Sequence, residues 1–139
     1  MINRCNQFSQ NRNIPVSENG RTFRVINDTQ KYINKVEVDG CYITNGAKCD
    51  WLFEVVEKDL VSNVFYVELK GSDISHAIVQ LETTISHCEK FHSSTQRQAY
   101  IVASKVPKSG TSSQVYKKNF TSKNNIQLFI DTNRKEVTI

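Results

Sequence analysis

Two stretches in the middle of the chain carry its strongest strand pattern. Residues 49–57 (CDWLFEVVE) and residues 63–70 (NVFYVELK) are rich in aromatic and β-branched side chains, which favour β-strands. The seven residues between them, 57–63, are polar enough to form a loop. The pattern therefore predicts an antiparallel hairpin whose loop is centred near Leu60.

Weaker alternation of apolar and polar residues predicts further strands on both sides of this hairpin. These predicted strands are residues 21–27, 31–44, 98–106 and 126–139. Asp39-Gly40 is a turn signal inside the second of them, so that stretch is predicted to form a hairpin of its own. The last stretch is predicted as a strand or a hairpin.

After Gly71 the spacing of apolar residues changes from two to three and four, which indicates a helix. Ser72 or Asp73 would cap it, and the apolar stripe continues to about Phe91. Residues 108–114 read as a loop, and residues 115–123 as a short helix. Together the elements predict a single domain over residues 1–139 of mixed α/β or α+β class, with one mixed sheet flanked by helices and a flexible segment over residues 1–20.

Composition narrows the class of protein. The chain is 38% hydrophobic and 23% charged, which is typical of a globular domain, and no apolar run approaches a membrane span or a signal peptide. We therefore expect a soluble, cytoplasmic protein with no membrane partner and with reduced cysteines. A zinc site could be built from Cys41, Cys49, Cys88 and His92, but their spacing matches no usual zinc pattern. His76, His87 and His92 read as partly exposed helix residues.

The net charge of +4 is unevenly distributed along the chain. Residues 90–139 hold nine Lys/Arg and two Asp/Glu, whereas residues 1–89 hold nine Lys/Arg and twelve Asp/Glu. A basic surface beside an acidic site suits a polyanion held across a metal centre, and a solvated surface of ordinary composition explains the same numbers.

The central hairpin carries candidate chemistry at its open end. With a loop near Leu60, Asp50 lies opposite Lys70 and Leu52 opposite Glu68, so Asp50, Glu68 and Lys70 project from one face. Trp51, Phe53, Val67 and Leu69 would face the other way. Two carboxylates can hold Mg²⁺, and an adjacent ammonium can orient a water molecule or stabilise a transition state.

Asp50 followed by Glu68-Leu69-Lys70 at the end of a strand and then by a helix resembles the PD-(D/E)XK nuclease superfamily, the restriction-endonuclease-like proteins. The resemblance covers roughly residues 48–106. It implies a Mg²⁺-dependent endonuclease, with Mn²⁺ as a substitute, that hydrolyses phosphodiester bonds in DNA. Asp50 and Glu68 would bind the metal, Leu69 would offer its carbonyl, Lys70 would assist the attacking water, and Gln80 would lie near the metal.

The sequence departs from that pattern in two places. A proline is missing before Asp50, where Cys49 stands, and Thr84 occupies the position of a tyrosine found in the RecB-type subgroup. An upstream acid often completes the metal site in the superfamily, and here only Glu18 or Glu37 could supply it.

Other functions fit the same residues. A nuclease-fold module that no longer cuts could bind nucleic acid or a protein partner, and a structural subunit would use Glu68 and Lys70 only as a surface ion pair. Under the nuclease hypothesis, each chain carries one active site, so a homodimer would provide the two sites that cleavage of both DNA strands needs. Lysines at or beyond the end of the predicted strand 98–106 could contact phosphates; these are Lys105, Lys108, Lys117, Lys118 and Lys123.

Overall fold

The computed structural model of the chain describes residues 1–106 and 110–139, and they form a mixed α+β fold with two β-sheets. The larger, six-stranded sheet has the order β1-β4-β5-β6-β7-β8. Its strands are β1 (Asn6–Ser9), β4 (Tyr32–Glu37), β5 (Trp51–Glu57), β6 (Leu60–Lys70), β7 (Gln96–Ala103) and β8 (Gln127–Thr132). The smaller sheet has the order β2-β3-β9, from β2 (Asn13–Glu18), β3 (Arg21–Ile26) and β9 (Arg134–Thr138).

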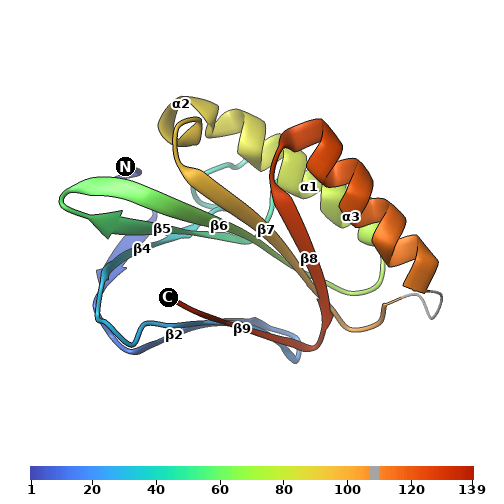
Figure 1. Cartoon of the computed structure of the whole chain (residues 1–139), viewed down its shortest axis with the longest axis horizontal. Coiled ribbons are helices and arrows are strands. Elements are labelled where there is room, and N and C mark those ends of the chain that lie inside the picture. Colours follow the sequence, from blue (N-terminus) through green and yellow to red (C-terminus); the bar gives the residue numbers. More distant parts are fainter. Residues whose placement is uncertain (107–109) are drawn as a thin grey trace.

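Figure 1 shows three layers, with the helices on one face of the six-stranded sheet and the smaller sheet on the other. The helices are α1 (Ile74–His87), α2 (Glu89–His92) and α3 (Gly110–Asn124). Helix α1 packs on β6 and β7, and α3 packs on β8. Helix α1 connects β6 to β7, which are parallel, whereas β4, β5 and β6 are antiparallel neighbours.

Strand β6 is buried on both faces because it lies between two hydrophobic cores. Val64 and Tyr66 pack toward the helices, whereas Phe65, Val67 and Leu69 pack toward the smaller sheet. Trp51 and Phe53 of β5 lie on the same side as Val67 and Leu69, as the sequence pattern predicted. Glu68 therefore lies in the buried run 64–69 of β6, whose other residues pack in the two hydrophobic cores.

The predicted register of the β5–β6 hairpin is wrong by two residues. Leu52 pairs with Tyr66, not with Glu68. The expected seven-residue loop is a two-residue turn, because Lys58 and Asp59 both adopt positive φ and let β6 begin at Leu60. The turn alone would shift the pairing by three residues, and a bulge between Val55 and Val56 brings the difference back to two. Because the error is an even number of residues, every side chain stays on the predicted face.

The expectation of one mixed sheet is also wrong, since the strands near both chain ends build the second sheet. The final predicted strand or hairpin divides at Asn133, which has φ +63°, and β8 and β9 then join different sheets. Residues 1–20, predicted to be flexible, contain β1 and β2. Ile14 and Val16 alternate with exposed residues and are buried beneath the six-stranded sheet, a periodicity that the Asn/Gln-rich composition obscured.

The predicted helix after Gly71 is confirmed. Asp73 caps it by accepting from the His76 N–H at 3.0 Å, and the helix breaks at Cys88 before the short α2. The predicted short helix is the longer α3, which begins at Gly110, inside the predicted loop; Lys108 lies outside the described residues. Within the described part of the chain, no helix is long and apolar enough to cross a membrane.

The cysteines differ from the expectation of four reduced thiols. A disulfide joins Cys5 to Cys41, whose Cα atoms lie 5.8 Å apart, whereas Cys49 and Cys88 are free and buried. The sequence could not show this pair, since Cys5 and Cys41 are 36 residues apart and meet only through the β1–β4 pairing.

Candidate metal and catalytic site

Asp50 and Glu68 meet where β5 begins and β6 ends. Trp51 pairs with Val67, so Asp50, just before β5, lies opposite Glu68 of β6. The Asp50 amide donates to the Val67 carbonyl at 3.1 Å, and Asp50 Oδ2 accepts from the Leu69 amide at 2.8 Å. The hairpin therefore fixes the Asp50 carboxyl group against the Glu68-Leu69-Lys70 segment.

The two carboxyl groups strongly affect each other's protonation. Burial and the adjacent negative charge of Asp50 raise the pKa of Glu68 to about 9. Burial also raises the pKa of Asp50, to about 6, against the effect of the hydrogen bond from Leu69. The two carboxyl groups lie close enough to share a proton. Near neutral pH the pair is thus held with one fewer negative charge than two free carboxylates would carry.

Glu68 is only 1% exposed, and its Oε1 atom has no hydrogen-bond partner among the described residues. A buried carboxyl oxygen without a partner is costly, since it loses its hydration and gains nothing in exchange. Such an atom is what an oxygen-preferring cation would satisfy.

Lys70 lies two residues beyond Glu68 on the same face of β6, half-buried at the end of the strand. Its positive charge lowers the pKa of Glu68, against three larger effects that raise it: burial, the charge of Asp50 and the Asp50 side chain's hydrogen-bonding interaction. Among the described residues, no carboxylate lies within ion-pair distance of its ammonium group. Lys70 is therefore not the partner in a simple surface ion pair with Glu68.

Helix α1 holds the chain that leads into Asp50. Gln80 Nε2 donates to the Lys48 carbonyl at 3.1 Å, and Thr84 Oγ1 accepts from the Cys49 amide at 2.8 Å. Gln80 Oε1 is buried and, within the described part of the chain, has no partner. Sequence reasoning missed the role of Thr84, although Gln80 and Thr84 are four residues apart and so share one face of the helix.

The two candidate upstream acids, Glu18 and Glu37, differ in their position relative to Asp50. Glu37 pairs with Trp51, so its side chain lies on the opposite face of the sheet from Asp50. Glu18, at the end of β2, is close enough for its charge to raise the pKa of Asp50. The described residues nevertheless contain no group of three or more His, Cys, Asp or Glu side chains placed to hold one metal ion.

The candidate phosphate-binding lysines are dispersed. Lys105 follows β7, and its amide donates to the Gly71 carbonyl at 3.3 Å, next to Lys70. Lys117 and Lys118 lie on α3, and Lys123 at the end of that helix pairs with Glu82 at 3.3 Å. Of the candidates that lie in the described part of the chain, only Lys105 comes to the end of the sheet that carries the carboxyl pair.

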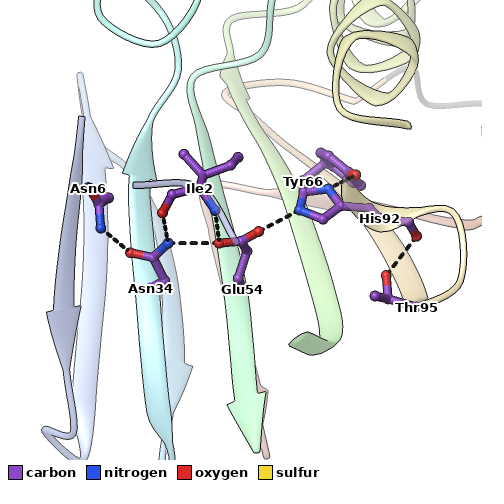
Figure 2. A network of polar contacts seen from close by, with 7 residues as sticks. All are labelled: Ile2, Asn6, Asn34, Glu54, Tyr66, His92 and Thr95. Carbon is purple, nitrogen blue, oxygen red and sulfur yellow. Dashed lines mark hydrogen bonds and ion pairs between the residues drawn. The ribbon is translucent and has the colours of Figure 1, made fainter. Parts of the chain in front are cut away.

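A second buried acid, Glu54, belongs to a network that Figure 2 shows in full. Glu54 Oε2 lies 2.6 Å from His92 Nε2, and the Tyr66 hydroxyl lies 2.5 Å from His92 Nδ1. Glu54 Oε1 accepts from the Ile2 amide and from Asn34 Nδ2. Glu54 and His92 are both 0% exposed, so no substrate reaches them. This network is a structural tie between the N-terminus, β4, β5 and α2.

The predictions for the three histidines and for the zinc site have different outcomes. His76 and His87 are exposed, but the prediction for His92 is wrong, because it ends α2 inside the core. The imagined zinc site loses Cys41 to the disulfide, and His92 is already bonded through both ring nitrogens.

We expect Glu68→Gln to stabilise the protein in the absence of divalent cations, and to do so more as pH rises. The folded pKa of Glu68, about 9, lies above its ordinary value of 4.5, so the native protein binds a proton that the unfolded chain has released. Stability is thus lost as pH rises from 4.5 to 9, whereas neutral glutamine avoids that loss. Thermal unfolding in EDTA should show a higher Tm for the variant at pH 8 and no difference at pH 4.

Glu37→Gln is the matched control, since it removes an exposed carboxyl from the opposite face. Parallel Tm-against-pH curves for native protein and Glu68→Gln would show that Glu68 is not held protonated by its surroundings.

Comparison of the chain with protein-family models, with curated proteins and with solved structures finds no match.

Proposed function

We propose that the protein is a metal-dependent nuclease that hydrolyses phosphodiester bonds in DNA, with its site at Asp50, Glu68 and Lys70. The observation that carries the proposal is the contrast between two buried glutamates. Glu54 has partners for both carboxyl oxygens, whereas Glu68 keeps one oxygen without a described partner beside a second carboxyl group and a lysine. Perturbed carboxyl groups that a fold does not satisfy internally are typical of functional sites.

The donor set fits a hard divalent cation such as Mg²⁺ or Mn²⁺. Asp50 and Glu68 provide carboxyl oxygens, and the unpartnered Glu68 Oε1 is available to a ligand. A cation there would take the place of the proton that the pair shares, so its binding should strengthen as pH rises. When bound, it would lower the pKa of a water molecule on the metal and would offset negative charge on the phosphate. Leu69, whose amide fixes Asp50, is proposed to add its carbonyl oxygen.

The residues of the chain have separate tasks in this proposal. Asp50 and Glu68 would hold the cation, and the hydrogen bond from Leu69 keeps Asp50 in place. The Lys70 ammonium orients the attacking water and stabilises negative charge that develops on the phosphate. Gln80 and Thr84 position the Lys48–Asp50 backbone from α1. A homodimer would place two such sites for cleavage of both strands.

The sheet topology supports a restriction-endonuclease-like arrangement. The antiparallel strands β4, β5 and β6 are followed by the crossover helix α1 and the parallel strand β7. This places Asp50 and Glu68-Leu69-Lys70 at one end of a mixed sheet with a helix behind them, as the resemblance implies.

The direct test is cleavage of labelled linear duplex, branched and single-stranded DNA in Mg²⁺, in Mn²⁺ and in EDTA. We expect cleavage of at least one substrate with either metal and none in EDTA. Binding without cleavage under all conditions would favour the alternative, an inactive module that holds nucleic acid. Neither binding nor cleavage would refute both functions for DNA.

A further inference from the structure

The turn between β2 and β3, residues 18–21, presents two charged side chains toward the six-stranded sheet. Val16 of β2 and Phe23 of β3 are paired and buried in the core between the sheets. Glu18 and Arg21 are the next pair on that face, so they lie at its rim, just beyond the apolar contacts. A turn at Asn19 and Gly20, both with positive φ, closes the hairpin directly behind them.

This turn is fixed at the end of the sheet that carries the carboxyl pair. Arg21 Nη1 donates to Ser104 Oγ at 2.6 Å, and the Ser104 amide donates to the Gly71 carbonyl at 2.8 Å, immediately after Lys70. Through Ser104, Arg21 therefore lies at the same end of the six-stranded sheet as Lys70, on the face that carries the smaller sheet.

Backbone hydrogen bonds hold the same turn rigidly. The Thr22 amide donates to the Asn133 carbonyl at 2.9 Å, and the Asn133 amide donates to the Ala103 carbonyl at 2.8 Å. Ala103 is the last residue of β7, so the turn, the β8–β9 connection and the end of β7 form one tied unit. A charged group carried on such a unit is positioned before a ligand arrives.

Arg21 has unused hydrogen-bond donors at that position. Its guanidinium group has five N–H donors, and Ser104, a neutral residue, takes one of them. Nε is buried and has no partner in residues 1–106 and 110–139, and no carboxylate there lies within ion-pair distance of Arg21. A planar cation with unused donors matches the oxygens of a phosphate.

We propose that the β2–β3 turn is a substrate-binding arm, and that Arg21 contacts a backbone phosphate of the nucleic acid bound at the Asp50–Glu68 site. The inference rests on the proposed nuclease function and extends it to a strand pair outside the region of family resemblance. Glu18 on the same turn repels the substrate until a cation offsets the local acidic charge. The arm therefore binds nucleic acid most strongly when the metal is present.

The test is equilibrium binding of labelled DNA by Lys70→Ala protein in Mg²⁺, with and without Arg21→Ala. Removing Arg21 should weaken binding about tenfold, because a hydrogen-bonded charge contact is lost, and should lower the slope of log affinity against log salt by about one. Arg21→Lys should restore part of the affinity. Arg24→Ala is the matched control: Arg24 lies on the outer face of β3, pairs with Glu136 at 3.4 Å, and should leave binding within about twofold.

Each outcome separates this inference from the proposed function. If the protein cuts DNA and Arg21→Ala still binds DNA normally, the proposed role of the β2–β3 turn is wrong and the proposed nuclease function stands. Binding that depends on Arg21 in a protein that cuts nothing would support the arm and refute the nuclease. Equal weakening by Arg21→Ala and Arg24→Ala, or no DNA binding by the parent protein, would overturn the arm. Circular dichroism melts of each variant identify any loss caused by misfolding.

Discussion

Lys70→Ala should reduce metal-dependent DNA cleavage by about a hundredfold or more, because the charge that orients water and stabilises the developing negative charge is removed. The proposed metal ligands Asp50 and Glu68 remain, so the variant should still bind Mg²⁺ and DNA. Single-turnover cleavage at saturating enzyme measures the chemical step directly. A loss confined to that rate, with binding retained, distinguishes catalysis from substrate affinity.

Lys58→Ala is the matched control for that experiment. Lys58 lies in the exposed turn at the opposite end of the same hairpin, so its removal should leave cleavage unchanged. Equal rates for native protein and Lys70→Ala would contradict the assignment of Lys70 to the reaction.

Glu54→Ala should destabilise the protein by about 3–5 kcal/mol, the cost of removing one member of a fully buried, hydrogen-bonded pair. The Ile2 amide, Asn34 and His92 would each lose an acceptor. Thermal unfolding should show Tm lower by roughly 10 °C. Cleavage by the fraction that remains folded should be normal, since the network does not contact the candidate site.

Glu57→Ala is the matched control: it changes the same strand at its exposed end, where Glu57 pairs with Lys31, and should leave Tm nearly unchanged.

The pH dependence of stability distinguishes Glu54 from Glu68. Burial raises the pKa of Glu54, but its hydrogen bonds outweigh burial and the pKa lies below its ordinary 4.5. The stability that Glu54 provides is therefore present above pH 4.5 and lost as pH falls further, opposite to the behaviour of Glu68. A small Tm change in Glu54→Ala would contradict the structural role.

The central part of the fold could be predicted from the sequence because its signals are local and agree with one another. The two strongest strands, the period change after Gly71 and the Asp73 cap all specify the β5–β6–α1 unit that carries Asp50, Glu68 and Lys70. The register error did not matter to the site, because a shift of two residues preserves the face of every side chain.

The second sheet could not be assembled from local patterns. Its strand β9 pairs in parallel with β3, more than a hundred residues earlier in the chain, and no hairpin signal connects them. The β2–β3 turn did have a signal, since Asn19-Gly20 is typical of a two-residue hairpin. Glu54 was also visible as a polar residue in an apolar run, but its pairing with His92 across 38 residues appears only in the folded chain.

Anomalous diffraction from crystals soaked in Mn²⁺ tests most directly whether Asp50 and Glu68 form a metal site. The proposal predicts a peak bonded to oxygens of both carboxyl groups, at distances of about 2.1 Å, that disappears in Asp50→Asn. No peak at that position in millimolar Mn²⁺, or an identical peak in Asp50→Asn, would contradict the account of this pair as the metal centre of a nuclease.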